Sequence, residues 1–249
     1  ISASLVGSPF ATLGFAAHQG HFLRVAGDPQ EWLTSRGFEP VSRFDESARP
    51  DAQQPWIIKV ISPLHSRISR VSDTITAWAL AAETLAQSPL VPSMFMHSQG
   101  GQTPMLAIAM EELTDYVQAS HLTTEELGEV LTLLEQLSNL QVPCIHTDIR
   151  LPNFVRQLHD GSIKMLDWDS LVPAMSYLTS AMTERRAPRL PKIARSTQAM
   201  CLNVAVYHLA ALSCGTRCGS DFDKWLKGRA DADDARHALY ADAWDLHNS

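Results

Sequence analysis

The pattern of hydrophobic and polar positions changes about halfway along the chain. Over about the first 60 residues, runs of branched and aromatic residues are separated by glycine, proline and aspartate, and these runs predict strands at 1–6, 13–25 and 56–61. The polar stretch 28–54, which is rich in proline and arginine, predicts a loop or an insertion. We therefore expect the chain to begin with an antiparallel sheet.

A helix and a hairpin are predicted next. Residues 72–87 have a helical composition, and prolines shortly after them end the predicted helix. Strands are predicted at 94–97 and 105–110, on either side of a glycine-containing hairpin turn at 99–102. These elements extend the predicted sheet.

A helical period begins at Thr123. Thr123 and Glu126 have the spacing of a capping box, and leucine and valine recur at helical spacing as far as Leu140. This pattern predicts a helix of about five turns.

Two strands and a buried helix are predicted after it. Strands at 154–157 and 163–166 are joined by His159–Asp160–Gly161, which is typical of a hairpin turn. Residues 200–212 are apolar nearly all round, so we expect a buried helix there. The order of elements predicts an α+β fold with a small, sheet-based N-terminal lobe (1–112) and a mostly helical C-terminal lobe (113–249).

Composition narrows the classes of protein that fit. The 249 residues carry a net charge of −7, which gives no overall basic field to attract nucleic acid. No stretch reaches the roughly 18 uninterrupted apolar residues that a membrane helix needs, and the start lacks a signal-peptide pattern. We expect a soluble, cytoplasmic protein, although a chain that begins at Ile1 leaves room for a removed leader.

The four cysteines do not predict a disulfide scaffold. Cys144 has apolar neighbours and is expected in the core. Cys214 and Cys218 form a CxxxC pair without a second ligand pair at zinc spacing, which argues against a zinc site.

The stretch Cys144 to Val155, which reads CIHTDIRLPNFV, carries the clearest chemical signal, together with Asp167–Trp168–Asp169 after the hairpin. The first segment resembles the catalytic loop HxDxxxxN of the protein kinase superfamily, and the second stands where that family has Asp-Phe-Gly. The resemblance implies an ATP and Mg²⁺ site. Asp148 would accept or orient the proton of the acceptor hydroxyl, and Asn153 and Asp167 would hold Mg²⁺.

Alternatives to these roles remain. Asp148 and Asn153 could be turn residues, and Asp167 a strand-end cap. His146 is expected to be a packed, hydrogen-bonded framework residue. Arg150 stands where many protein kinases carry a lysine that contacts the transferred phosphate, and a solvated arginine is the alternative.

Lys59, within the predicted strand 56–61, resembles the family's nucleotide-binding lysine on its third strand. A buried ammonium needs a carboxylate partner, and Glu83 on the following helix is our candidate. Asp73 is the alternative, although its place near the start of the predicted helix suits an N-terminal capping role better.

Residues 105–113, reading MLAIAMEEL, resemble the family's fifth strand entering the hinge, whose backbone groups would pair with adenine. The resemblance makes Met110 the gatekeeper and assigns the hinge to Glu111, Glu112 and Leu113. An apolar strand followed by acids is also common in unrelated proteins.

The chain departs from the family in several places. The glycines within 6–16, where the phosphate clamp is expected, lack the GxGxxG spacing, and Thr147 replaces the arginine that usually precedes the catalytic aspartate. No Ala-Pro-Glu segment is found, and the helix at 200–212 lacks an expected aspartate. Together these features indicate a divergent, minimal kinase, similar to fungal and effector-type kinase-like proteins and to aminoglycoside and choline kinases.

The sequence thus predicts an ATP-dependent phosphotransferase that acts on a hydroxyl, more readily of a protein Ser or Thr than of a small molecule. The basic stretch 183–195 lies where the family places its substrate-facing segment, and a solvated loop is the alternative. A pseudokinase that binds without turnover and a small-molecule kinase are the competing interpretations.

Overall fold

The computed structural model of the chain describes residues 21–25, 27–41, 55–61, 68–101, 104–177 and part of 201–212. Predictions for 1–20, for the basic stretch 183–195 and for Cys214 and Cys218 lie outside the described residues. The fold is α+β with antiparallel sheets. The chain divides into two compact units, one of Ile1–Ala86 and Val91–Thr114 and the other of Gln87–Leu90 and Asp115–Ser249.

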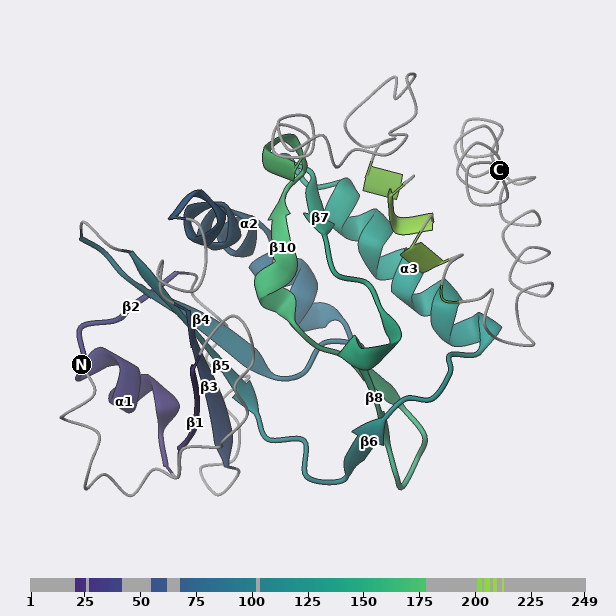
Figure 1. Cartoon of the computed structure of the whole chain (residues 1–249), viewed down its shortest axis with the longest axis horizontal. Helices are drawn as coiled ribbons and strands as arrows, with labels where there is room; N and C mark the ends of the chain where they lie inside the picture. The colour runs from purple at the N-terminus through teal and green to yellow at the C-terminus, as the bar shows by residue number, and fades with distance from the viewer. Residues whose placement is uncertain are drawn as a thin grey trace. The chain divides into compact units, whose positions relative to one another are not determined.

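The first unit contains a five-stranded antiparallel sheet in the order β1-β3-β5-β4-β2 (Figure 1). Its strands are β1 (His21–Val25), β2 (Glu39–Pro40), β3 (Trp56–Ile61), β4 (Met94–Gln99) and β5 (Met105–Glu111). The predicted strand 56–61 is confirmed residue for residue, and the hairpin of β4 and β5 is also confirmed.

A short helix, α1 (Pro29–Thr34), lies inside the stretch predicted to be a loop, so that prediction was wrong there. The Asp28 side chain accepts a hydrogen bond from the amide of Gln30 at 2.8 Å and caps the helix. Trp32 and Leu33 then pack with one face of the sheet, in a cluster that includes Ile58. Six residues give too little helical period to be seen in the sequence.

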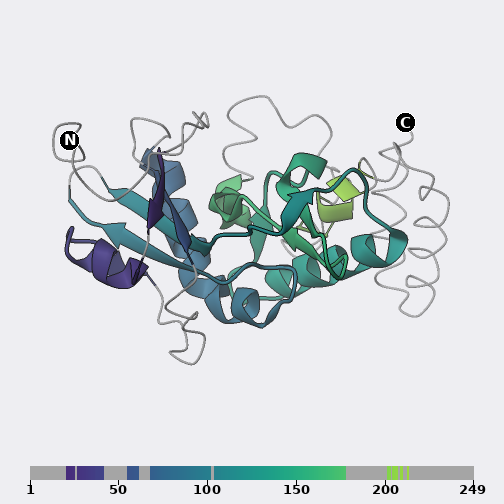
Figure 2. The same cartoon turned by 90° about the horizontal axis from the view of Figure 1, so that it is seen from below.

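The longer helix α2 (Ile68–Gln87) ends where it was predicted to end and begins four residues earlier. Its buried positions include Thr74, Trp78 and Leu85. Figures 1 and 2 show α1 and α2 on opposite sides of the sheet, so both faces of the sheet are covered.

In the second unit, α3 (Thr124–Ser138) begins with the predicted capping box. The Thr123 hydroxyl accepts from the amide of Glu126 at 3.2 Å, and the Glu126 carboxylate accepts from the amide of Thr123 at 2.7 Å. The helix has 15 residues, which is about four turns rather than five. Leu140 lies beyond its end, because the chain leaves the helix at Asn139.

Two small antiparallel sheets follow: β6 (Tyr116–Gln118), β8 (Phe154–Gln157) and β9 (Ile163–Met165) form one, and β7 (Cys144–His146) and β10 (Leu171–Pro173) form the other. Single 3-10 turns lie at Leu151–Asn153 and Trp168–Ser170. The hairpin between β8 and β9 is confirmed, and Gly161 in its turn has φ +75°, which favours glycine.

The segment 87–90 joins this unit through β9. The amide of Met165 donates to the carbonyl of Leu90 at 2.7 Å, and Lys164 Nζ donates to the carbonyl of Pro89 at 2.8 Å. The segment 87–90 is therefore fixed to the strand that precedes Asp167.

The described residues of 201–209 are helical and mostly buried, as predicted for this stretch. Cys201 and Val204 pack with Ile145 of β7 and Val172 of β10. Cys144 is buried, as expected. No helix in the described ranges combines the length and apolar character that crossing a bilayer requires.

Candidate active site

The loop after β7 and the turn before β10 are joined through Thr147. Its amide and its hydroxyl both donate to the carbonyl of Ser170 at 3.0 Å. His146 and Leu171 are partners in the β7–β10 ladder. The loop that carries Asp148 and the turn that carries Asp167 are therefore held to one another by neighbouring residues.

Asp148 is held by three partners. Asn153 Nδ2 donates to its main-chain oxygen at 2.7 Å and to its Oδ2 at 3.0 Å. The amide of Asp148 donates to His146 Nδ1 at 3.2 Å, and Arg150 Nη2 lies 3.0 Å from Oδ2. Within the part of the chain that the structure describes, no group donates to Oδ1. Oδ1 is therefore the carboxylate oxygen of Asp148 that is not used by the described residues.

Asn153 connects Asp148 to the segment before Asp167. The main-chain oxygen of Asn153 accepts from the amide of Leu166 at 2.7 Å. Its side chain is buried, and its two side-chain hydrogen bonds to Asp148 both use Nδ2, so Oδ1 is the atom that remains for a cation.

Asp167 has an unusual backbone. Its φ of 64° and ψ of 38° lie in the left-handed region, and it is the one non-glycine residue with positive φ among those described. Aspartate enters this region more easily than most residues, and such outliers concentrate at functional sites. The amide of Ser170 donates to its carbonyl at 2.9 Å and closes the turn. The direction of the Asp167 side chain is thus set by a specific backbone conformation.

His146 supports the site without exposure to solvent. Its ring packs edge-on against Trp168 with centroids 5.1 Å apart, and Trp168 Nε1 donates to the carbonyl of Met165 at 2.7 Å. Complete burial lowers the pKa of His146 to about 4, against the opposing effects of the Asp167 and Asp148 carboxylates. The Asp167 backbone also favours the protonated ring, although Nε2 has no well-aligned acceptor among the described residues. The ring is neutral near pH 7 and acts as the framework residue that was predicted.

The oxygen donors fit Mg²⁺ better than a transition metal. An amide oxygen from Asn153 and a carboxylate from Asp167 are hard ligands, and Mg²⁺ in phosphotransferases takes its other ligands from phosphates and water. No group of three or more His, Cys, Asp or Glu residues in the described ranges is placed to hold a metal.

Arg150 is mostly solvated, with 61% of its side chain exposed, yet it pairs with Asp148. The exposure agrees with a solvated arginine, and the contact of Arg150 with a phosphate stays a prediction.

In the first unit, Lys59 and Met110 share one face of the sheet. Lys59 is paired in register with Ile108, and Met110 with Ile57, two residues before Lys59 on β3. Lys59 is half-buried, and its Nζ lies 5.7 Å from the ring centroid of Phe22. The predicted nucleotide lysine and gatekeeper thus point to the same side.

The carboxylate partner of Lys59 stays a prediction. Glu83 is exposed and lies on the side of α2 opposite its buried positions, such as Trp78 and Leu85. Asp73 is half-buried and lies in the second turn, because α2 begins at Ile68, so it does not cap the helix as the sequence suggested. Glu83 therefore stays the predicted partner of Lys59, with Asp73 as the alternative.

Two of the three residues predicted to form the hinge already make hydrogen bonds or ion pairs within the protein. The amide of Glu111 donates to the carbonyl of Ser93, and the amide of Glu112 donates to the carbonyl of Pro55, both at 2.9 Å. The Glu112 carboxylate pairs with Arg24 at 2.8 Å. The main chain of Leu113 makes no hydrogen bond within the described part of the chain. Of the three residues predicted to form the hinge, Leu113 is thus the one whose main-chain groups are not used by the described residues.

One residue of the site was not singled out from the sequence. Thr147 was noted only as a departure from the family, yet its amide and hydroxyl join the Asp148 loop to Ser170.

A comparison with protein families finds no family model that matches the chain, and a comparison with curated proteins finds no significant match.

Proposed function

We propose that the chain is an ATP- and Mg²⁺-dependent phosphotransferase with a bilobal, protein-kinase-like fold, which transfers the γ-phosphate to a hydroxyl. The observation that carries the proposal is the double connection of Asn153, whose side chain binds Asp148 and whose carbonyl binds the residue before Asp167. A base and two metal donors are thereby grouped on neighbouring segments. If Asp148, Asn153 and Asp167 were only turn or cap residues, they would not need to be connected in this way.

Asp148 is suited to orient the acceptor. Asn153 and Arg150 hold its Oδ2, so Oδ1 would accept the proton of the incoming hydroxyl. Phosphoryl transfer needs little covalent help from the protein, because positioning and charge stabilisation supply most of the acceleration. When bound, Mg²⁺ would neutralise charge on the phosphates, and Asn153 and Asp167 would hold it.

The resemblance assigns Lys59, Met110 and Leu113 to the nucleotide. The sheet face that Lys59 and Met110 share, and the main chain of Leu113, which the described residues leave unbonded, support this assignment. A protein Ser or Thr remains our proposed acceptor, and the motif residues that are retained argue against a pseudokinase, because a scaffold need not keep all of them.

The test is thermal unfolding with and without ATP and Mg²⁺, for the wild type, Asp167→Asn and Asp148→Asn. Asparagine tolerates the left-handed backbone at 167 and removes the charge. At ten times Kd, a ligand that binds only the folded state adds about 1.4 kcal/mol of stability. We expect Mg²⁺-dependent stabilisation of the wild type and of Asp148→Asn, and its loss in Asp167→Asn.

Turnover separates the remaining alternatives. With ATP and a panel of generic protein substrates and hydroxyl-bearing metabolites, the wild type should transfer phosphate and Asp148→Asn should not. Binding without any transfer would favour a pseudokinase, and transfer only to metabolites would favour a small-molecule kinase. Absence of stabilisation at millimolar ATP would refute the proposed function.

A further inference from the structure

The ion pair of Arg24 and Glu112 joins the first and third of three neighbouring strands. Arg24 Nε and Nη2 both lie 2.8 Å from Glu112 Oε2. Arg24 belongs to β1, Glu112 follows β5, and β3 lies between these two strands. Neighbouring strands are about 4.8 Å apart, so the pair bridges about 10 Å of sheet, which takes two long side chains. The pair therefore ties β1 directly to the segment that leaves β5.

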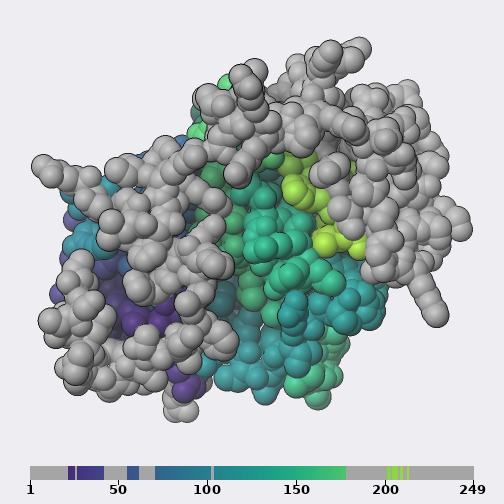
Figure 3. Space-filling model, in the orientation of Figure 1, coloured from purple at the N-terminus to yellow at the C-terminus, as the bar shows by residue number. Residues whose placement is uncertain are grey.

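The pair lies on the face of the sheet that carries Lys59 and Met110. Side chains alternate between the two faces along a strand. Leu23 and Val25, on either side of Arg24, pack in the cluster that contains α1, so Arg24 points to the other face. Arg24 and Met110 are also in register with the same residue of β3. Atoms of 21–25 and 27–41, in purple, reach the surface in the view of Figure 3. The pair thus borders the face assigned to the nucleotide.

Glu112 is held through its amide, its carbonyl and its carboxylate. Its amide donates to the carbonyl of Pro55 at 2.9 Å, and its carbonyl accepts from the amide of Thr114 at 3.1 Å. A hydrogen bond between residues two apart closes a three-residue turn, and Leu113 is at its centre. Arg24 binds the carboxylate. The main-chain groups of Leu113 therefore belong to a turn whose first residue is fixed by three contacts.

The effect of the ion pair is local. The side chains of Arg24 and Glu112 are 47% and 20% exposed, and pairs with this exposure contribute little to the stability of a whole domain. The turn itself has few other bonds, because Thr114 is exposed and the main chain of Leu113 is not bonded to any described residue. A segment with few contacts opens locally without global unfolding. Loss of the pair would therefore change how often the turn is formed rather than whether the protein folds.

We propose that Arg24 is a positioning residue for the nucleotide base, because it holds the turn Glu112–Thr114 in the arrangement that presents the Leu113 main chain to adenine. The inference rests on the proposed phosphotransferase function and adds to it a residue that belongs to none of the kinase-like motifs. Apparent affinity falls in proportion to the population of the binding arrangement. If the turn is formed about one-tenth of the time without the pair, the Kd of ligands that carry adenine rises about tenfold.

The turn is tested first without any ligand, by amide hydrogen exchange. We expect the amides of Glu112 and Thr114 to exchange about tenfold faster in Arg24→Met than in the wild type, because both are bonded only while the turn is formed. Arg36→Met is the matched control. Arg36 is also exposed, but its guanidinium lies 4.0 Å from the ring centroid of Trp32, in α1 on the other side of the sheet. Unchanged exchange of both amides in Arg24→Met would overturn the proposal.

Calorimetry with three ligands then separates the base from the phosphates. The ligands are MgATP, adenosine and inorganic triphosphate with Mg²⁺. We expect Arg24→Met to weaken MgATP and adenosine about tenfold and to leave triphosphate unchanged, whereas Arg36→Met should leave all three unchanged. Equal weakening of MgATP and triphosphate would overturn the proposal, since Arg24 would then act only by attracting the phosphates. An unchanged Kd for adenosine would overturn it as well.

A charge exchange tests whether the ion pair itself is responsible. Arg24→Glu and Glu112→Arg should each weaken MgATP about tenfold, and the double variant should recover most of this loss because it restores the pair. A double variant that binds no better than either single variant would overturn the proposal. A wild type that binds none of the three ligands would refute the proposed function instead, and hydrogen exchange would still decide whether Arg24 fixes the turn.

Discussion

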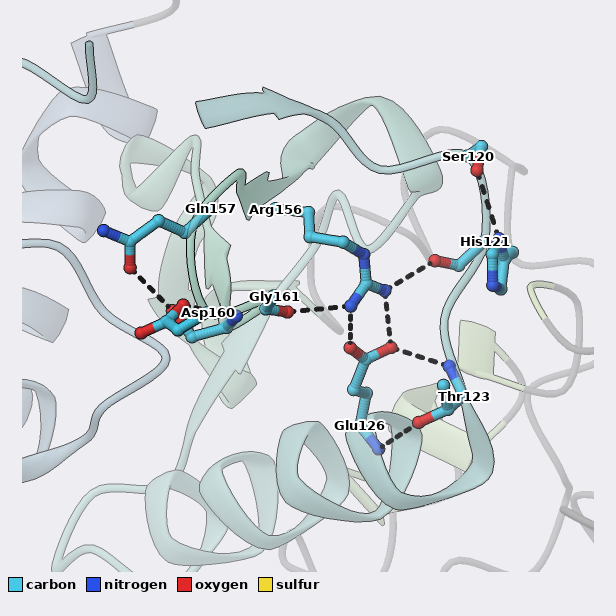
Figure 4. Close-up of polar contacts among 9 residues, drawn as sticks. Ser120, His121, Thr123, Glu126, Arg156, Gln157, Asp160 and Gly161 are labelled. Atoms are coloured by element: carbon cyan, nitrogen blue, oxygen red, sulfur yellow. Dashed lines mark hydrogen bonds and ion pairs between the residues drawn. The ribbon is translucent and has the colours of Figure 1, made fainter. Parts of the chain in front are cut away.

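The ion pair of Arg156 and Glu126 links β8 to the start of α3 and gives a stability prediction that follows from its geometry (Figure 4). The two terminal nitrogens of Arg156 donate to both carboxylate oxygens, with Nη2 2.8 Å from Oε2. The same nitrogens donate to the carbonyls of His121 and Gly161, at 3.2 and 2.8 Å. One side chain thereby joins a helix start, the segment before it and the β8–β9 turn.

Arg156→Met keeps the aliphatic stem and removes these bonds. Breaking a fully buried pair costs about 3–5 kcal/mol, because the remaining charge is left without a partner. The side chains of Arg156 and Glu126 are 27% and 14% exposed, so we take the lower end, about 3 kcal/mol. In a chain of this size that corresponds to a melting temperature lower by about 6–12 °C.

The matched control is Arg24→Met. Arg24 also pairs with a glutamate, Glu112, at 2.8 Å, but its side chain is 47% exposed. Exposed pairs contribute about 1 kcal/mol or less. Urea unfolding followed by circular dichroism measures both variants. A loss in Arg156→Met no larger than that in Arg24→Met would refute the reasoning.

The same pair has a defined pH dependence. Burial raises the pKa of Glu126, but hydrogen bonds from Arg156 and from the Thr123 amide outweigh this effect and leave the pKa below its ordinary value of 4.5. The stabilisation is therefore complete above pH 4.5 and is lost as the pH falls through the lowered pKa. The difference between wild type and Arg156→Met should shrink over that range.

Three further predictions concern single residues. The pKa of His146 is about 4 in the folded protein, against an ordinary value of 6.5. The free energy of unfolding should therefore fall by about 3 kcal/mol between pH 6.5 and pH 4. Urea unfolding of His146→Asn at several pH values should show a smaller change of this free energy with pH. Gly161→Ala, at φ +75°, should lower stability by about 1–2 kcal/mol in thermal melts, whereas Gly100→Ala, which meets no neighbour and has no positive φ, should change it by under about 0.5. Leu113→Pro should weaken ATP binding about tenfold in calorimetry through loss of its N–H, and equal affinities of Leu113→Pro and Leu113→Ala would contradict the hinge assignment.

The elements that were predicted correctly have a strong local signal. The strand 56–61 and the strand 154–157 consist of residues suited to strands between clear breaks, and the capping box at Thr123 fixes the start of α3. The three-residue strands β7 and β10 were missed because they carry no period, and their pairing joins segments far apart in the sequence. Tertiary contacts, rather than propensity, create such strands.

The candidate site shows the same division. Asp148, Asn153 and Asp167 could be selected from their types and spacing, because the chemistry constrains both. Neither the left-handed backbone of Asp167 nor the use of Nδ2 by Asn153 can be read from a sequence, since each depends on how the loop closes. Glu83 was chosen for its charge and its place after β3, and its pairing with Lys59 stays a prediction.

The attachment of 87–90 to β9 bears on how this protein can be divided. A genetic split after Thr114 would give two polypeptides, and the first would carry a peptide that belongs to the second unit. The bonds from Met165 and Lys164 to that peptide would then become intermolecular. Because the segment 87–90 would be supplied by the other polypeptide, we expect the two fragments to complement each other rather than to fold independently.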